Sequence, residues 1–326
     1  MNILILSGGT RNKIVQYFKK ELGTRGRVLV TDCSPLAPAL YEADEYFLVS
    51  RITEHGYIDE ILNICKGNNI TGVLSLIDPE LTLLAENYDK FKEIGTTPII
   101  SDVDLINLSF DKYEFSKFVT ELGFKSIRSY KELESFNKDY ELGVIDFPVF
   151  AKPITGSASI NINKVTSNEQ LEDLFNRYDD LLIQEMMDEK EYGVDVYIDM
   201  VSHEPVSIFI KEKLAMRAGE TDKSVSVRNE KLFNIIFNFV KKAGYRGIID
   251  IDVFEKNGEF YISEVNPRFG GGYPHAYEVG VNVPKQIINN LNNNKNKENF
   301  EYEQDIFMMK FNEVNIQKIV NNRGVN

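Results

Sequence analysis

The sequence predicts a mixed α/β and α+β protein, and three of its features support this fold class. Short aliphatic runs alternate with amphipathic segments over residues 1–105, as they do in a parallel sheet with crossover helices. Residues 231–244 form a longer amphipathic segment that ends in glycine, which indicates a helix. Two runs of alternating apolar residues, 248–254 and 260–266, flank an Asn-Gly pair, which indicates a β-hairpin.

Length and composition narrow the class of protein. The chain has 326 residues, of which 43% are hydrophobic and 27% are charged. It is therefore long enough for two or three lobes with sizeable cores, and its composition is that of a globular protein. The formal charge of −13 argues against nucleic acid or an anionic membrane as the main partner.

The sequence gives no sign of secretion or membrane insertion. The aliphatic run 2–6 is too short for a signal peptide and continues into glycines. No apolar run approaches the roughly 20 residues that span a bilayer. Cys33 and Cys65 fit neither a disulfide framework nor a zinc motif. We therefore expect a cytoplasmic protein.

The N-terminal part repeats a strand–helix unit. The turn Ser7-Gly8-Gly9 joins the first strand to a helix, as in a Rossmann-like β-α-β unit. No third glycine follows at the spacing of the dinucleotide fingerprint, so an NAD site is not favoured. Strands are expected at 2–6, 28–31, 45–49, 72–75 and 98–101, and helices at 13–22, 57–66 and 80–87.

Two lysines lie where phosphate groups could bind. Asp111 predicts the start of a helix, and Lys112 then lies in its first turn, where the helix dipole disfavours a cation unless an anion is near. Lys152 ends a β-run, and a loop of small residues, 155–159, separates it from a strand at 160–165. Backbone N–H groups of such a loop can surround phosphate oxygens, although the G-K-[ST] of a P-loop is absent. The alternative for Lys112 is a solvated surface lysine.

Two further segments suggest ligand contacts. The apolar run 181–187 turns abruptly polar before a strand at 193–200, an arrangement that suits a purine in a flat apolar slot with polar ends. An acidic surface turn is the alternative. A strand at 206–210 leads into the charged stretch 211–223. We expect this stretch to be a substrate and phosphate contact loop with Arg217 as its cation, rather than an ordinary mobile loop.

The turn of the predicted hairpin decides which side chains share a face. A two-residue Asn257-Gly258 loop would place Asp252 opposite Ser263 and leave Glu264 on the other face. A three-residue loop with the glycine in the left-handed conformation would bring Asp252, Glu264 and Asn266 together. We expect the second arrangement. A half-exposed hairpin with merely solvated acidic residues is the alternative.

The residues after the hairpin add a cation and several glycines. Arg268 would lie beside the three oxygen donors, which would suit a hard cation such as Mg²⁺ with room for phosphate oxygens. A strand that ends in the glycines 270–272 is costly unless a ligand approaches the backbone there. We interpret His275 as structural, with substrate orientation or proton relay as the alternative. The polar tract 292–299 predicts a solvated loop, and 305–311 a late strand.

These motifs together resemble one family. The order D-x(11)-E-x-N-P-R, formed from Asp252 to Arg268, resembles the metal-binding end of the ATP-grasp superfamily. The likeness is to its carboxylate–amine ligase and carbamoyl-phosphate-synthetase-like branch. It covers residues 105–290 through motifs and 1–105 through general architecture. Members of this superfamily activate a carboxylate with ATP as an acyl phosphate, and an amine or another nucleophile then displaces the phosphate.

The resemblance implies a nucleotide site. Lys112 and Lys152, 40 residues apart, would hold the ATP phosphates. Glu185 would accept from the adenine amino group, Met187 would bond the ring through its backbone, and Glu191 would take the ribose hydroxyls. The small-residue loop would act as a lid over the phosphates through Gly156, Ser157 and Ser159.

The resemblance also implies a metal site and catalytic side chains. Asp252, Glu264 and Asn266 would bind two Mg²⁺ ions, with Mn²⁺ as an alternative metal, and Glu264 would bridge the two ions. Arg268 would stabilise the acyl phosphate. The implied catalytic residues are Lys152, Arg217 and Arg268.

The implied fold is an ATP-grasp fold, in which a Rossmann-like pre-ATP-grasp lobe precedes two α+β subdomains that sandwich ATP. We expect the lobe at 1–105, the lysines and lid at 106–183, the hinge and metal site at 184–290, and a polar loop and tail at 291–326. Dimerisation of identical chains is expected by analogy.

The expected activity is that of an ADP-forming ligase that joins a small carboxylate, such as an amino acid, to an amine. One alternative is a stand-alone synthetase-like subunit that phosphorylates bicarbonate or carbamate. Another is a nucleotide-binding subunit without turnover. The chain is too short for the two ATP-grasp halves of a full carbamoyl-phosphate synthetase and has no amidotransferase cysteine motif. Expected partners are small molecules, not nucleic acid or membrane.

Overall fold

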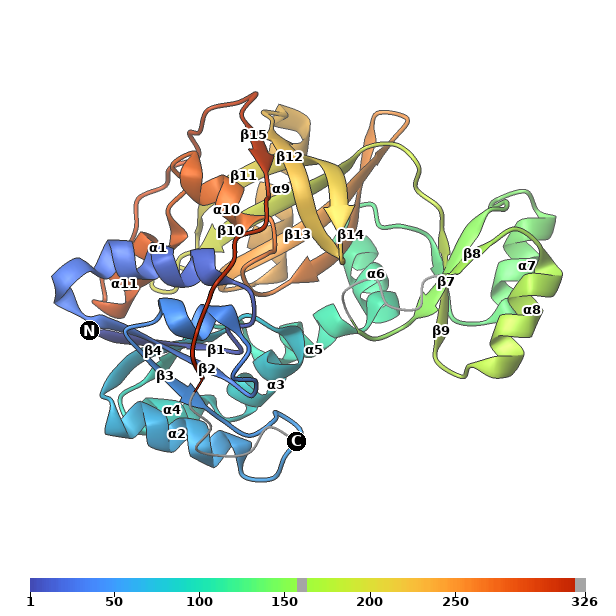
Figure 1. Cartoon of the computed structure of the whole chain (residues 1–326). Coiled ribbons are helices and arrows are strands. Elements are labelled where there is room, and N and C mark those ends of the chain that lie inside the picture. Colours follow the sequence, from blue (N-terminus) through green and yellow to red (C-terminus); the bar gives the residue numbers. More distant parts are fainter. Residues whose placement is uncertain (157–162, 320–326) are drawn as a thin grey trace. The chain divides into compact units, whose positions relative to one another are not determined.

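A computed structural model describes residues 1–156 and 163–319 (Figure 1). The chain divides into two compact units. One consists of Met1–Ile99 together with the chain from Met309 onward, and the other of Ile100–Met308. Each unit has its own sheet or sheets, so each can be understood from its own sequence pattern.

The first unit is built on a parallel sheet with helices between its strands. The strands are β1 (Asn2–Leu6), β2 (Arg27–Asp32), β3 (Glu45–Leu48), β4 (Ile70–Ser75) and β5 (Thr97–Pro98). The helices are α1 (Asn12–Leu22), α2 (Tyr57–Gly67), α3 (Asp78–Glu86) and α4 (Tyr88–Glu93), with 3₁₀ turns η1 (Gly23–Arg25) and η2 (Pro38–Glu42). The sheet order is β3-β2-β1-β4-β5 and all its pairs are parallel (Figure 1). The predicted parallel α/β lobe is confirmed.

The central strands of this sheet show why the aliphatic runs fold as they do. Ile3, Leu4, Ile5 and Leu6 are all fully buried. A strand that is apolar on both faces is stable only in the middle of a sheet that is covered on both sides. The short run 2–6 therefore belongs in the centre of the parallel sheet.

The second unit begins with α5 (Val103–Phe110) and α6 (Lys112–Glu121), followed by an antiparallel sheet. Its strands are β6 (Ser129–Tyr130), β7 (Val149–Pro153), β8 (Asn163–Val165) and β9 (Leu181–Glu185), in the order β6-β9-β7-β8. Figure 1 shows α7 (Leu133–Glu141) and α8 (Asn168–Arg177) beside this sheet. Their side chains Phe136 and Leu171 pack with Val149 and Ala151 of β7 in one apolar core. Because side chains alternate along a strand, Lys152 lies on the opposite face from that core.

A second sheet, of six strands, completes this unit. Its strands are β10 (Glu191–Ile198), β11 (Pro205–Arg217), β12 (Glu220–Ser226), β13 (Gly247–Lys256), β14 (Glu259–Asn266) and β15 (Phe307–Met309). Its helices are α9 (Glu230–Ala243), α10 (Tyr273–Glu278) and α11 (Val283–Leu291). The strand order is β14-β13-β10-β11-β12-β15.

The two faces of the six-stranded sheet differ in chemistry. On one face, Val194 and Val196 of β10 pack with Phe115 of α6 and with Leu232 and Phe239 of α9. The intervening positions of β10 are Gly193 and Asp195, which therefore point to the opposite face. That opposite face carries the candidate site.

Helix α9 is close to the predicted segment 231–244. Asn229 caps it by accepting a hydrogen bond from the Leu232 backbone N at 3.0 Å. Gly244 ends it with φ +86°, a conformation that glycine adopts without strain. The apolar stripe of the segment faces the sheet, as its periodicity predicts.

The polar tract 292–299 is an exposed loop with one anchored residue, Asn296. Asp199 Oδ2 accepts from Asn296 N at 2.9 Å, from Asn296 Nδ2 at 2.8 Å and from Asn290 Nδ2 at 2.8 Å. Asp199 is fully buried, so its ionised carboxylate requires these donors. The predicted solvated loop is confirmed, because seven of the eight residues 292–299 are exposed, and Asn296 anchors this loop by donating to a buried acid.

Candidate functional site

The β13–β14 hairpin carries the predicted metal ligands, and its turn is shorter than expected. Lys256 pairs with Glu259, so the loop consists only of Asn257 and Gly258. Their φ angles are +54° and +72°, as a type I′ turn requires. This turn follows the natural twist of the two strands, and the predicted three-residue loop is wrong.

A β-bulge nevertheless brings the predicted ligands together. The register near the turn would place Asp252 opposite Ser263, but it shifts between Asp252 and Val253, and Asp252 pairs with Glu264 instead. An extra residue in one strand has this effect, because it exchanges the faces of the residues beyond it. Directly opposed side chains share a face, and Asn266 follows two positions later on that face. The expected convergence is therefore correct, but it results from a bulge rather than from the loop.

The chemistry of the donor set fits a hard divalent cation. Asp252 and Glu264 supply carboxylate oxygens, and Asn266 lies beside them with its Nδ2 3.5 Å from Glu264 Oε1. Arg268 Nη2 donates to Asn266 Oδ1 at 3.3 Å. Over residues 1–156 and 163–319, no group of three or more His, Cys, Asp or Glu side chains could hold a metal ion. A metal here would therefore rely on two carboxylates and an amide, an oxygen set that suits Mg²⁺.

Of the two predicted phosphate lysines, Lys152 lies near these carboxylates and Lys112 lies near Lys152. Burial lowers the pKa of Lys152 to about 8; Glu264 and Asp252 oppose that effect, and Lys112 adds to it. Charged groups that influence the pKa of Lys152 must lie close to it in space. The six-stranded sheet and β7 thus bring two ammonium groups and two carboxylates into one site.

The start of the predicted lid loop is tied to α6. Lys112 N donates to Ile154 O at 3.2 Å, and Lys112 Nζ donates to Gly156 O at 2.5 Å. Gly156 has φ +104°, which only glycine adopts easily. The predicted phosphate contacts of Ser157 and Ser159 lie outside the described residues.

The predicted purine-binding residues lie at the junction of β9 and β10. Glu185 ends β9, Glu191 begins β10, and Met187 lies between the two strands. Glu185 Oε1 is 2.7 Å from Lys256 Nζ, and the hairpin turn donates a backbone N–H to the Glu189 carboxylate at 3.0 Å. The junction is therefore fixed to the metal-ligand hairpin.

Residues 211–223 form a β-hairpin, β11–β12, rather than the predicted contact loop. Ile208 and Ile210 of β11 face the apolar core. Side chains continue to alternate between the two faces of the sheet through the charged residues, so Lys211 and Lys213 point to the opposite face. Lys211 is only 1% exposed, and its Nζ lies 2.5 Å from Asp195 Oδ2 and 3.9 Å from Asp250 Oδ1. The density of charge concealed this strand from sequence reasoning, although its period of two was the signal that could have found it.

Lys213 is a second site residue that the sequence reasoning missed. Its Nζ lies 2.6 Å from Asp252 Oδ1 and 2.7 Å from Glu191 Oε1. Its side chain is 5% exposed. The lysine thus joins the predicted metal ligand to the predicted ribose ligand.

Arg217 has a different environment from the one predicted. It ends β11, beside a turn in which Ala218 and Gly219 have φ +51° and +76°. Its Nη2 pairs with Asp222 Oδ1 at 2.7 Å, and its side chain is 52% exposed. It is part of a hairpin tip, and its catalytic role stays a prediction.

The glycines after β14 are explained by side chains of this same chain. A Cβ on Gly270 would lie 2.4 Å from Asp250 Cγ, and one on Gly272 would lie 2.5 Å from Lys211 Cε. A Cβ on Gly271 would lie 2.8 Å from the Glu220 carboxylate. Contacts this short cannot be accommodated without a shift. The glycine run is therefore required where the backbone covers buried charges, and a ligand is not needed to account for it.

His275 has the contacts of a structural residue. Its Nδ1 and Ser224 Oγ are hydrogen-bonded at 2.8 Å, and its ring lies 5.0 Å from that of Phe209. Burial lowers its pKa to about 4, and Lys211 adds to the effect. At neutral pH the imidazole is uncharged, as a buried ring is expected to be.

The first unit also has polar groups at the ends of its strands. Asp32 accepts from Gly9 N at 2.9 Å, which is ordinary turn chemistry. Glu80 is buried and accepts from Ser75 Oγ at 2.5 Å and from the Tyr57 hydroxyl. These acidic groups therefore have partners within their own unit.

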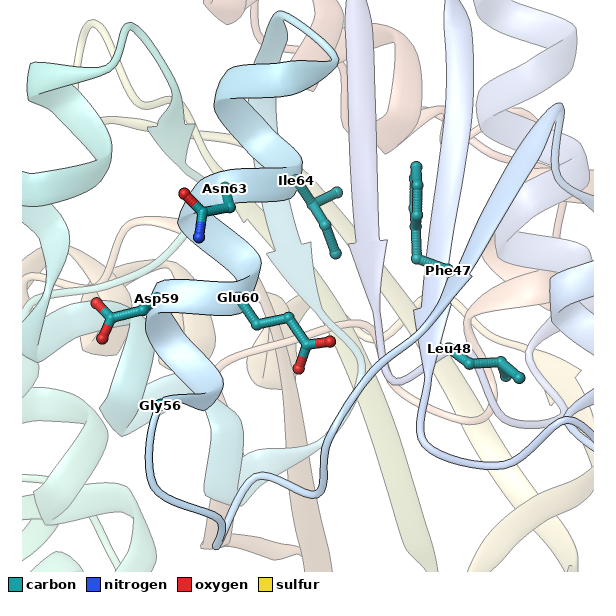
Figure 2. Close-up of a pocket in the computed structure, with 7 residues that line it drawn as sticks. All are labelled: Phe47, Leu48, Gly56, Asp59, Glu60, Asn63 and Ile64. Atoms are coloured by element: carbon teal, nitrogen blue, oxygen red, sulfur yellow. The ribbon is translucent and has the colours of Figure 1, made fainter. Parts of the chain in front are cut away.

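An open groove lies between β3 and α2 of the first unit (Figure 2). Its volume is about 590 Å³. One of its acids, Glu60, accepts from Ser50 N at 2.9 Å. The groove contains none of the predicted site residues; its lining consists of Phe47, Leu48, Gly56, Asp59, Glu60, Asn63 and Ile64.

Within the two described ranges, every helix is too short or too polar to cross a membrane.

Two family models match the chain: a PylC-like N-terminal domain over residues 3–99 and an ATP-grasp domain over residues 110–272. The second match spans half of the chain.

The chain is similar to large chains of carbamoyl phosphate synthase. It is 23% identical over 257 residues to the arginine-specific large chain of Bacillus subtilis, with coverage of 74% of this chain and 24% of that protein. It is 24% identical over 254 residues to the large chain of Clostridium beijerinckii, with coverage of 71% and 23%. The chain thus spans about a quarter of the length of these relatives.

Solved structures share the fold. N5-carboxyaminoimidazole synthetase from Staphylococcus aureus complexed with ADP gives a TM-score of 0.75 at 16% identity, over 95% of this chain and 82% of that chain. The biotin carboxylase domain of Hydrogenobacter thermophilus 2-oxoglutarate carboxylase, in complex with MgADP, ADP and bicarbonate, gives 0.74 at 17% identity, over 94% and 73%. The predicted fold, a parallel α/β lobe followed by α+β parts, is confirmed. The chain belongs to the ATP-grasp family.

Proposed function

We propose that the chain is an ATP-dependent, ADP-forming ligase that joins a small carboxylate to an amine. One observation carries the proposal: Lys152 lies in electrostatic range of Asp252 and Glu264 and also of Lys112. Ammonium groups match phosphate oxygens, and paired carboxylates match a hard metal ion. A site that offers both suits a metal-bound nucleoside triphosphate. The ADP and MgADP complexes among the similar structures support ATP and Mg²⁺ as its ligands.

The proposed nucleotide contacts follow the chain order. Lys112 and Lys152 bind phosphate oxygens, Glu185 and the Met187 backbone bind the base, and Glu191 binds the ribose. Asp252, Glu264 and Asn266 hold Mg²⁺, with two ions and Mn²⁺ substitution as further expectations. The metal supplies neutralisation of phosphate charge when it is bound.

The proposed reaction has two steps. A substrate carboxylate oxygen attacks the γ-phosphorus of ATP, the bond from that phosphorus to the ADP oxygen breaks, and an acyl phosphate and ADP form. The amine nitrogen then attacks the acyl carbon, phosphate departs with the electron pair of the C–O bond, and the nitrogen loses a proton. Such chemistry depends on positioning and charge stabilisation rather than on a protein nucleophile.

Arg268 has a suitable position for the charge on the acyl phosphate. Its guanidinium is oriented by Asn266 Oδ1 at 3.3 Å and by Phe269 O at 3.1 Å. Because two acceptors already hold this planar cation in place, its side chain loses little conformational entropy when an anion binds. We assign Arg268 this role, with Lys152 as the second cation at the transferring phosphoryl group.

A second candidate is the phosphorylation of bicarbonate or carbamate by a stand-alone subunit. The similarity to carbamoyl phosphate synthase large chains favours it. A nucleotide-binding subunit without turnover is less well supported, because both lysines and all three oxygen donors are present.

The experiment that tests these proposals measures ADP and phosphate release with Mg-ATP. Pools of carboxylates and amines are screened, and bicarbonate is tested separately. ADP release that requires a carboxylate and an amine supports the ligase, whereas release with bicarbonate alone supports the second candidate. No release together with tight Mg-ATP binding in calorimetry would favour a subunit without turnover. Absence of ATP binding would refute the proposed function.

Three further expectations stay predictions. The predicted boundaries at 105, 183 and 290 fall inside α5, β9 and α11; limited proteolysis, which cuts exposed segments, can test whether the chain separates beside them. A homodimer can be tested by light scattering. The cytoplasmic location can be tested by cell fractionation.

A further inference from the structure

The most informative unpredicted residue is Lys213. Its ammonium lies 2.6 Å from Asp252 Oδ1 and 2.7 Å from Glu191 Oε1. Both distances are those of charge-assisted hydrogen bonds. A nearly buried lysine that holds two carboxylates is costly to separate from them. Lys213 therefore occupies the site as long as nothing displaces it from these carboxylates.

The sequence provides for this position through Gly193. The β10 register places Gly193 beside Lys211 on one side and Asp252 on the other. A Cβ on Gly193 would lie 3.1 Å from Lys211 Cε and 3.2 Å from Lys213 Cε. Because Gly193 has no side chain, the lysine side chains of β11 have room to cross β10 and reach carboxylates of β13.

The proposed function asks the same two carboxylates to bind other groups. Asp252 would bind a metal ion, and Glu191 would bind a ribose. An ammonium group and a divalent cation cannot both lie against one carboxylate oxygen without strong repulsion. Even a metal ion on the other oxygen of Asp252 would be repelled by the Lys213 ammonium, so metal binding there is opposed while the ammonium stays in place.

We infer that Lys213 is a resident cation of this site, and that it competes with the metal ion for Asp252 until a nucleotide binds. The inference rests on the proposed function and concerns its regulation. A nucleotide displaces the ammonium from Glu191, and its phosphates supply the negative charge that the ammonium loses. Metal and nucleotide thus bind with positive coupling, and by linkage each raises the affinity for the other.

The inference can be tested with Mn²⁺ as a probe, counted by the electron paramagnetic resonance signal of the free ion. Wild-type protein is titrated with Mn²⁺ alone and with Mn²⁺ plus a non-hydrolysable ATP analogue. We expect the analogue to raise Mn²⁺ affinity by about tenfold or more, within the usual range of coupling between ligands. Tight Mn²⁺ binding by the wild type without nucleotide would overturn the inference, and this arm needs no variant.

The variant Lys213→Met should bind Mn²⁺ alone about tenfold more tightly than the wild type, and most of the coupling should disappear. Lys152→Met removes a charge that affects Asp252 without touching it, so its gain should be much smaller. Lys241→Met removes an exposed ion pair with Glu204 and a cation–π contact with Phe237, neither of which belongs to the site, and should leave Mn²⁺ binding unchanged. Circular dichroism verifies that each variant is folded.

The outcomes separate this inference from the proposed function. Equal gains for Lys213→Met and Lys152→Met would show general charge repulsion and overturn the assignment of Lys213. Analogue binding without any coupling to Mn²⁺ would also overturn it, while leaving the ATP site intact. If the analogue does not bind at all, the proposed function itself has failed.

Discussion

The substitution Gly270→Ala distinguishes two explanations for the glycine run after β14. One is that a ligand approaches the backbone there, and the other is that the backbone covers the buried carboxylate of Asp250. The φ angle of Gly270 is not in the left-handed region, so alanine creates no backbone strain. The effect of the substitution therefore reports only on what surrounds the added methyl group.

The geometry gives the size of the expected effect. The new Cβ would lie 2.4 Å from both Asp250 Cγ and Asp250 Oδ2, and 2.7 Å from Oδ1. The Asp250 side chain is 14% exposed and lies 3.9 Å from the Lys211 ammonium, so it has little freedom to move. Overpacking of this kind costs about 1–3 kcal/mol. For a unit of this size, we expect the melting temperature to fall by about 2–12 °C.

Differential scanning fluorimetry and urea denaturation of the whole chain measure this effect. Gly67→Ala is the control, because no atom lies within 4 Å of a Cβ at that helical position; it should be neutral or stabilising by about 0.5 kcal/mol. If Gly270→Ala leaves stability unchanged but weakens nucleotide or substrate binding, the packing explanation is refuted and the ligand explanation is correct.

Three other predictions follow from the site and its surroundings. Glu264→Ala should abolish ATP turnover while nucleotide binding partly survives, because the metal ligand is lost but the lysines remain; an active variant in the ADP-release assay would contradict the metal assignment. Nucleotide affinity should fall as pH rises through about 8, where Lys152 loses its proton, and calorimetry of Lys152→Arg should show no such fall because arginine stays charged. Asp199→Asn should lower the free energy of unfolding by about 2 kcal/mol at pH 7. Although burial raises the pKa of Asp199, hydrogen bonds from Asn290, Ser202 and Asn296 hold it at about 2. This stability is present above pH 4 and is lost as pH falls through about 2, so equal urea curves for the two proteins at pH 7 would contradict it.

The parallel lobe could be predicted from sequence because its signals are local. Runs such as 2–6 are apolar throughout and alternate with amphipathic helices. The local pattern of each strand and helix is therefore consistent with a parallel sheet covered by helices. The positions of Lys112 and Lys152 could also be predicted, since Lys112 lies at the start of a helix and Lys152 near the end of a strand. In these cases, the residue and its immediate neighbours contain the information.

The bulge opposite Asp252 and the long strand β11 could not be predicted in the same way. Asn257-Gly258 favours a two-residue turn locally, and the register that joins Asp252 to Glu264 is restored only by the extra residue Ser263. Nothing in the local sequence marks Ser263 as that residue. Lys211 and Lys213 were expected in a substrate and phosphate contact loop, because their partners come from β10 and β13, which are distant in sequence. These features depend on how side chains pair across neighbouring strands, and the sequence of one strand alone does not specify that pairing.

The charge balance of this face gives a reason for a metal site that does not depend on motifs. Four carboxylates face the ammonium groups of Lys211 and Lys213, and a fifth, that of Glu264, lies beside Asp252. Burial raises the pKa of Asp195 to about 6 even though Lys211 opposes it. Lys152 and Arg268 also act on these carboxylates, so five negative charges face four positive ones and one negative charge remains in excess. A divalent cation removes that excess. The five carboxylates belong to Glu191, Asp195, Asp250, Asp252 and Glu264.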